Sequence, residues 1–234
     1  MGLLTFGTGN LKLGKSDKNQ KYLSCGLSLL PHKLSGNNVC PSHSPSCAKW
    51  CINWAGLGRL PSTQKARLNK TKYFFEDRGG FLVDLMKELH AFNRKCKFLR
   101  KKPVCRLNVF SDLNWEKLCP TIFTTFKDFQ FMDYTKISSR YEKWLKGELP
   151  KNYYLVFSRS ELNHEKCLEF LKMGGNVAMV FEKEIPKTHL GFKCINGDKN
   201  DLRFLDPKGT ICALKSKGGA RKDDSGFVIK DTKC

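Results

Sequence analysis

Three cysteines stand close together in a stretch with little secondary-structure signal. Cys40, Cys47 and Cys51 fall within twelve residues, in a segment rich in Ser, Gly, Asn and Pro. Thiolates at this spacing can converge on one zinc ion or on three irons of a 4Fe-4S cluster. We therefore predict a metal site on these three residues, with His43 or Cys25 as the candidate fourth ligand of a zinc ion.

The alternative is that these thiols are inert and only fill space. The chain has 11 cysteines, and a single buried Cys behaves as a small hydrophobic residue. We prefer that interpretation for the cysteines that are scattered through expected helices and strands, namely Cys96, Cys105, Cys119, Cys167, Cys194, Cys212 and Cys234.

Polar side chains follow three apolar segments, residues 104–110, 129–134 and 153–157, which we expect to be strands. If these strands are parallel, their carboxyl ends meet at one edge of the sheet, where functional groups of such folds gather. The candidate catalytic residues at this edge are Asp112, Lys136, Arg159 and Glu161, and the candidate cofactor-binding residues are Asn108 and Asp133. The alternative is that polar residues at these turns, above all Ser160 and Asn163, are helix N-caps.

A second cluster of candidate binding residues lies near the end of the chain. Lys215 and Lys217 precede Gly218 and Gly219, so this segment could bind phosphate. It is not a Walker A motif, because no Gly-Lys-Ser/Thr follows at the required spacing.

The order of expected elements predicts the fold class. Near-continuous apolar strands alternate with helical segments, including one or two helices within residues 63–94, which is typical of a mostly parallel sheet covered by helices. We predict a full or partial (β/α) barrel with short antiparallel additions near the C-terminus. Residues 22–234 would form a single domain with a cysteine-rich loop at 35–51, and residues 1–21 a flexible basic arm.

Composition and charge indicate which partners and which cellular compartment are plausible for the protein. The chain of 234 residues carries 42 Lys and Arg against 22 Asp and Glu, a net charge of +20. This positive potential would attract nucleic acid or a nucleotide, although lysines spread over every solvated face would give the same total. An odd number of cysteines without a secretory signal favours reduced thiols in a cytoplasm. No apolar run is long enough to span a membrane.

Several motifs together resemble one family across most of the chain. They are VCPSHSPSCAKWCINWAGLGR (39–59), KYFFED (72–77), RLNVFSDLNWE (106–116), DYTK (133–136), YLVFSRSE (154–161) and the segment 197–218. In this order they resemble the phage gene product 88-like proteins. The resemblance implies a phage or mobile-element origin, and hence the cytoplasm of an infected or plasmid-bearing bacterial host.

A more distant similarity is to radical S-adenosylmethionine enzymes, which place three cysteines in the loop after the first strand of a partial (β/α) barrel. This similarity implies an iron–sulfur cluster whose open iron binds S-adenosylmethionine, and a reaction on a nucleotide or nucleic acid. The spacing C-x6-C-x3-C differs from that family's C-x3-C-x2-C. Two alternatives stay open: a zinc-stabilised basic module that binds nucleic acid without catalysis, and an accessory protein whose cysteines only pack.

Overall fold

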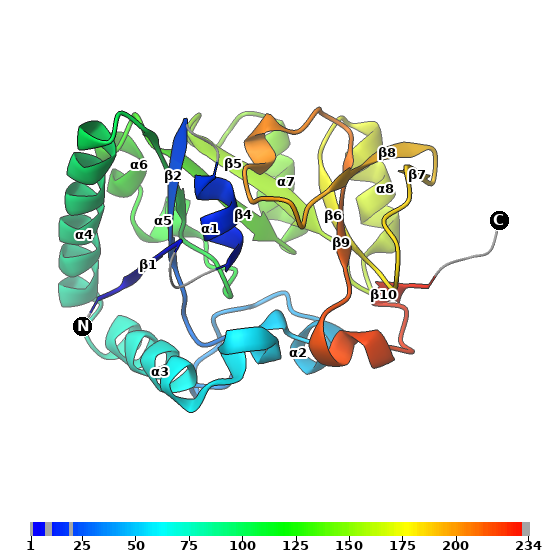
Figure 1. Ribbon diagram of the computed structural model, residues 1–234, viewed down its shortest axis with the longest axis horizontal. Coiled ribbons are helices and arrows are strands. Elements are labelled where there is room, and N and C mark those ends of the chain that lie inside the picture. Colours follow the sequence, from blue (N-terminus) through cyan, green and yellow to red (C-terminus); the bar gives the residue numbers. More distant parts are fainter. Residues whose placement is uncertain (1, 8–10, 19–20, 231–234) are drawn as a thin grey trace.

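The computed structural model describes residues 2–7, 11–18 and 21–230 and is built around one large sheet. Figure 1 shows this sheet with helices on both faces and along its lower edge. The strands are β1 (Leu4–Phe6), β2 (Tyr22–Leu27), β3 (Lys102–Arg106), β4 (Gln130–Thr135), β5 (Tyr153–Ser158), β6 (Val177–Phe181), β7 (Thr188–His189), β8 (Phe192–Asn196), β9 (Ile211–Lys215) and β10 (Val228–Ile229).

The sheet is mostly parallel and open. Its strand order is β1-β2-β3-β4-β5-β6-β9-β8-β7, and β10 pairs with β6. Strands β2 to β6, β9, β8 and β10 pair in parallel, whereas β1 and β7 are antiparallel to their neighbours β2 and β8. The prediction of a mostly parallel sheet is confirmed, and the sheet is not closed into a full barrel.

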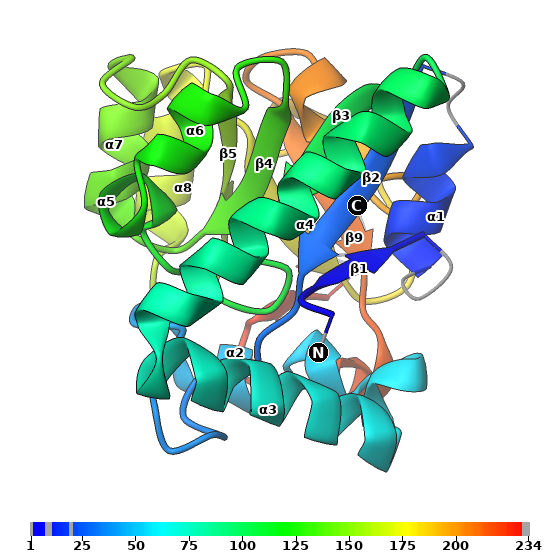
Figure 2. The same ribbon diagram turned by 90° about the vertical axis from the view of Figure 1, so that its left-hand side faces the viewer.

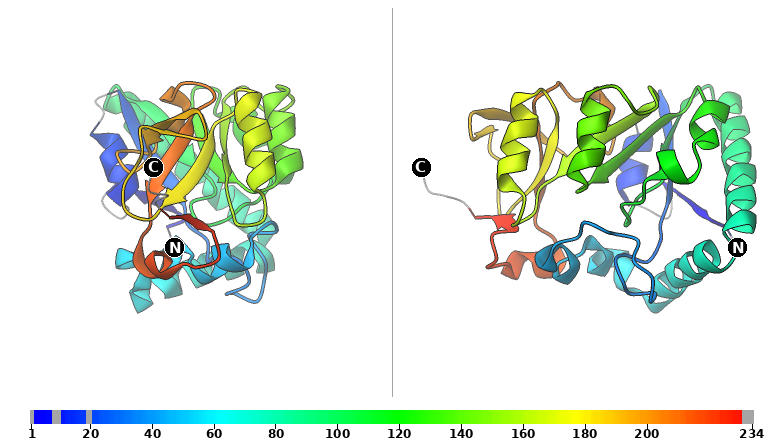
Figure 3. Two further views of the ribbon diagram at one scale, coloured as in Figure 1. Left: turned by 90° about the vertical axis from the view of Figure 1, so that its right-hand side faces the viewer. Right: turned by 180° about the vertical axis from the view of Figure 1, so that it is seen from behind.

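The helices cover the sheet in three groups. One face carries α4 (Arg78–Phe98), α5 (Trp115–Leu118), α6 (Thr121–Thr125), α7 (Ser138–Leu145) and α8 (His164–Lys172). The other face carries α1 (Leu11–Asp17), as Figure 3 shows from behind and from the side. The carboxyl edge carries α2 (Pro45–Lys49), α3 (Pro61–Glu76) and the 3-10 turns η1 (Ile52–Trp54), η2 (Gly56–Arg59) and η4 (Gly218–Lys222). The remaining 3-10 turn, η3 (Arg203–Leu205), precedes β9.

The two faces of the sheet differ in what covers them. The α4–α8 face forms the main apolar core, rich in aromatic rings such as Phe131 and Phe157. On the other face, Val156 and Cys212 lie beneath a buried polar layer. In that layer Arg106 Nη1 is 2.5 Å from Asp201 Oδ2, and Tyr134 donates to Asp201 at 3.0 Å. Because the charged groups are paired, this face can be closed without an uncompensated buried charge.

Two helices occupy the segment for which the sequence predicts one or two. The first, α3, ends at Glu76, and the Asp77 carboxylate then accepts a hydrogen bond from the Gly80 backbone N–H at 2.8 Å, which caps α4. The break therefore lies at Asp77, and the Gly79-Gly80 pair belongs to the first turn of α4.

One expectation needs correction. The segment predicted to be a flexible arm contains β1 and α1, and Leu3, Leu4 and Leu13 are buried because they pack on β2 and its neighbours. Residues 1, 8–10 and 19–20 of that segment lie outside the described residues. The predicted short antiparallel addition near the C-terminus is confirmed, since β7 and β8 are antiparallel to each other. Strand β9 is inserted between β6 and β8 and runs parallel to both.

Candidate functional site

The cysteine loop, defined as residues 31–51, follows β2 and lies along the carboxyl edge of the sheet, below the strands in Figure 1. Its first part has no regular structure, and it ends in the short helix α2. Ser44 caps this helix, because its side chain accepts a hydrogen bond from the Cys47 N–H at 3.2 Å. Pro45 occupies the first turn, where a missing N–H costs nothing.

Several strand ends hold the cysteine loop in place. After β3, Phe110 O accepts from Cys40 Sγ at 3.4 Å, and the Asp112 N–H donates to Val39 O at 2.8 Å. After β5, Glu161 accepts from the Ser44 hydroxyl at 2.7 Å and from the Ser46 N–H at 3.0 Å.

The segment after β9 adds a third anchor. Trp50 Nε1 donates to Asp223 at 2.8 Å, and Gly219 lies so close to the Trp50 ring that a Cβ there would approach it to 2.9 Å. The loop is therefore fixed across several strand ends.

The three thiols lie in one neighbourhood and are half-buried. Burial, together with the nearby Cys51 and Cys47 sulfurs, raises the pKa of Cys40 to about 12. Burial likewise raises the pKa of Cys51 to about 11, with Lys136 and Arg67 acting in the opposite direction. Among the described residues, however, no three His, Cys, Asp or Glu side chains are arranged as a metal site. The predicted metal site thus stays a prediction.

The two candidates for a fourth zinc ligand are placed differently. His43 belongs to the cysteine loop, with Nδ1 2.6 Å from Cys40 O and its ring stacked on His32 at 5.5 Å. Cys25 is fully buried on β2 beside Cys105. The thiol groups that act on it electrostatically are Cys105 and Cys96, so only His43 shares the loop's surroundings.

Asp112 and Lys136 lie at neighbouring strand ends and contact each other through the backbone. The Asp112 carboxylate accepts from the Lys136 N–H at 2.7 Å and from Arg140 Nη1 at 3.2 Å. Burial raises the pKa of Asp112, and the Arg140 charge opposes that shift. Lys136 Nζ donates to the Ser158 hydroxyl at 2.7 Å, which joins the ends of β4 and β5.

Arg159 and Glu161 contact different segments. Arg159 Nη1 donates to Gly226 O at 2.9 Å and to Phe227 O at 3.1 Å, so it holds the segment before β10. Burial lowers the pKa of Arg159. Glu161 faces α2, as described above. Of the four candidate catalytic residues, Glu161 therefore contacts the cysteine loop by its side chain, and Asp112 by its backbone.

Asn108 and Asp133 are both buried and bind to each other. Asp133 accepts from the Asn108 N–H at 2.9 Å and from the Tyr153 hydroxyl at 2.8 Å. Asn108 also accepts from Trp115 Nε1 at 3.2 Å. Burial raises the pKa of Asp133 to about 6, an effect that the Arg106 charge limits. These contacts shape the turn after β3.

Lys215 and Lys217 converge on an acid. The Lys215 N–H donates to Asp198 Oδ2 at 2.9 Å, and Lys217 Nζ lies 2.5 Å from Asp198 Oδ1. Asp198 thus occupies the place that a phosphate would take beside these two groups.

Two side chains near the candidate site, Arg140 and Arg67, are not indicated by the sequence. Arg140 is nearly inaccessible and pairs with Glu116 at 2.8 Å as well as with Asp112. Arg67 stacks on the Phe110 ring at 4.0 Å and hydrogen-bonds the Asn53 side chain. Both share their helix with other cations, and an exposed position is the ordinary expectation for a helical Arg.

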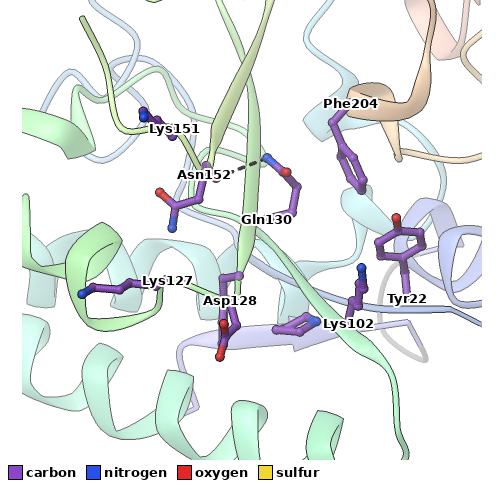
Figure 4. A pocket seen from close by; sticks show the side chains of 10 residues that line it. Tyr22, Lys102, Lys127, Asp128, Gln130, Lys151, Asn152 and Phe204 are labelled. Atoms are coloured by element: carbon purple, nitrogen blue, oxygen red, sulfur yellow. Dashed lines mark hydrogen bonds between the residues drawn. The ribbon is translucent and has the colours of Figure 1, made fainter. Parts of the chain in front are cut away.

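The protein has cavities at both edges of the sheet. At the amino edge a cavity of 380 Å³ is lined by Lys102, Lys127 and Lys151 together with Tyr22, Pro103, Asp128, Phe129, Gln130, Asn152 and Phe204. Figure 4 shows the lysines around it and the rings of Tyr22 and Phe204 on one side. At the other edge a cavity of 300 Å³ lies between β1 and α3.

Fold and site define an α/β protein with an open, mostly parallel sheet and a cysteine-rich loop fixed over its carboxyl edge. The model of one family, Gene product 88, matches residues 3–231. The chain belongs to this family, as the motifs predicted. No curated protein and no solved structure matches the chain. Among the described residues, no helix has the length and apolar character needed to cross a bilayer.

Proposed function

We propose that Cys40, Cys47 and Cys51 bind a 4Fe-4S cluster, and that the protein performs radical S-adenosylmethionine-like chemistry on a nucleotide or nucleic acid. One observation carries the proposal. Three half-buried, unpaired thiols share one loop that is fixed over the carboxyl ends of parallel strands. That edge is where α/β folds of this kind place their reacting groups.

The donor set suits a cluster. Sulfur ligands select iron–sulfur clusters or zinc, and three of them would leave one iron open to a small molecule such as S-adenosylmethionine. When bound, a cluster of this kind supplies one electron to that ligand. Burial raises the pKa of Cys51, but the charges of Lys136 and Arg67 oppose that shift and so favour the thiolate form that ligation requires.

Other residues would position the loop. Glu161 fixes the start of α2 through Ser44 and Ser46, and therefore sets where Cys47 lies. Asp112 and Lys136 link the loop to the ends of β3 and β4. We assign the protein to the cytoplasm of a phage-infected or plasmid-bearing host, where thiols stay reduced.

Metal analysis under anaerobic conditions tests the proposal. The purified or reconstituted protein should contain iron and acid-labile sulfide and absorb visible light, and Cys47→Ala should lose both iron and colour. Cys194→Ala is the matched control, because Cys194 is a half-buried cysteine on β8, outside the loop. Full iron content in Cys47→Ala would eliminate this ligand set.

A second candidate function is a zinc-stabilised module that binds nucleic acid without catalysis. Lysines around the amino-edge cavity favour it, together with the net charge of +20. The three cysteines and His43 would then supply the four ligands of zinc. A colourless protein with one equivalent of zinc per chain would favour this function over the first.

A further inference from the structure

The smaller cavity is polar and has cations but no acid in its wall. It lies between β1, the residue after β2 and the first half of α3, which Figure 2 shows beneath β1. Its lining residues are Thr5, Ser28, Ser62, Thr63, Ala66, Arg67 and Lys70. Hydroxyl, ammonium and guanidinium groups together form the donor set that proteins use for phosphate.

The two cations are partly withdrawn from water. Lys70 is 8% exposed and donates to Leu3 O at 2.7 Å. Burial lowers the pKa of both Lys70 and Arg67. Glu88, which accepts from the Leu3 and Leu4 N–H groups, acts on Lys70 but does not line the cavity. Because the cavity wall itself contains no acid, a bound anion would add to the partial compensation that Glu88 gives.

Ser28 gives an independent indication of a ligand. Its side chain is 6% exposed and lines the cavity, yet within the described part of the chain its hydroxyl has no hydrogen-bond partner. The hydroxyl is therefore free to donate to a group bound in the cavity. On the opposite wall, α3 begins at Pro61 with no side-chain cap and no acid in its first turn, so its first N–H groups remain available to an anion.

We propose that this cavity binds the phosphate group of a nucleotide or another phosphorylated small molecule, with Arg67, Lys70 and Ser28 as its donors. The cavity of 300 Å³ is larger than a phosphate ion, so it leaves room for the group that carries the phosphate. Arg67 lines this cavity and also interacts electrostatically with Cys51. A ligand bound to Arg67 would therefore lie next to the cysteine loop. The inference does not require a metal in that loop.

Calorimetric titration with inorganic phosphate and with adenosine monophosphate tests the site. Both probes should bind the wild type, and Arg67→Gln should weaken binding about tenfold, because it removes a charged hydrogen-bond donor. Lys65→Gln is the matched control: it removes the same charge from an exposed position on α3 that does not line the cavity, and it should bind as the wild type does.

Two further variants, Ser28→Ala and Cys47→Ala, test the site independently of Arg67. Since Arg67 also contacts Asn53, Ser28→Ala provides a second variant with a small structural change, and it should weaken binding of both probes as well. Binding should persist in Cys47→Ala, which separates this site from the proposed metal site. Absence of binding by both probes, or equal binding by Arg67→Gln, Ser28→Ala and the wild type, would overturn the inference.

Discussion

At the scale of single residues, buried charges are the most sensitive positions of the fold. Arg140 is 3% exposed and contacts three groups, the carboxylates of Asp112 and Glu116 and the Tyr153 hydroxyl. Its loss would remove the ion-pair partner of two buried carboxylates. Sequence patterns do not reveal this, because Arg140 occupies an ordinary position in a helix whose other charges are exposed.

Arg140→Met should therefore destabilise the protein by about 3–5 kcal/mol, the usual cost of removing one partner of a buried ion pair. Urea unfolding followed by circular dichroism measures the change. Lys143→Met, which lies on the same helix outside these pairs, should change stability by less than about 0.5 kcal/mol. A loss below about 1 kcal/mol for Arg140→Met would mean that these pairs contribute little.

The raised pKa of Asp133 predicts that the free energy of unfolding falls as the pH rises. Burial raises its pKa from 3.8 to about 6, so the folded state keeps a proton that the unfolded chain has already lost. The resulting stabilisation is complete below pH 3.8 and is lost as the pH rises to about 6. Within this window the wild type should lose about 1.4 kcal/mol per pH unit relative to Asp133→Asn. Urea unfolding of both proteins across the window tests this, and a constant difference would contradict it.

At the scale of elements, the cysteine loop depends on a contact between distant segments. Glu161 follows β5 and satisfies both the Ser44 hydroxyl and the Ser46 N–H at the start of α2. Glu161→Ala should loosen the loop, and iodoacetamide should alkylate Cys47 several times faster. Glu165→Ala, an exposed acid in the first turn of α8, is the control. Equal alkylation rates in Glu161→Ala and the wild type, determined by mass spectrometry, would show that Glu161 does not hold the loop.

Helices and strands of this protein are predictable where the local residue pattern matches the element that the fold contains. The strands β4 and β5 are apolar runs, and each begins within one residue of its expected position. Loop contacts are different. The spacing of the cysteines indicates a shared site, but it cannot reveal that Glu161 and Asp223 hold the loop, since those contacts join residues more than a hundred positions apart.

Contacts between distant residues also explain why the first segment of the chain is ordered although its sequence pattern predicts a flexible arm. Residues 1–21 are polar and rich in Gly and Lys, which is typical of a flexible arm. Yet Leu3 and Leu4 are held by Glu88 of α4 through their N–H groups, and Leu4 pairs with Leu27 of β2. A three-residue edge strand has too little pattern to be recognised before its neighbour is known.

At the scale of the whole molecule, three of the lysines that contribute to the net charge of +20 line one cavity at the amino edge of the sheet. Lys102, Lys127 and Lys151 precede or begin three adjacent strands, are exposed, and surround a cavity with aromatic and amide groups (Figure 4). Lysines that attract a phosphate backbone beside rings that can stack on bases are the combination that binds single-stranded nucleic acid.

Replacing these three lysines by Glu should therefore weaken binding of a single-stranded oligonucleotide, measured by fluorescence anisotropy across a salt series. If all three contact phosphates, the slope of log affinity against log salt should become less negative by about 2. The control is Lys33→Glu, Lys72→Glu and Lys187→Glu together, because these exposed lysines lie outside the cavity and change the net charge equally. Equal weakening by both triple variants would assign any binding to overall charge rather than to this edge of the sheet.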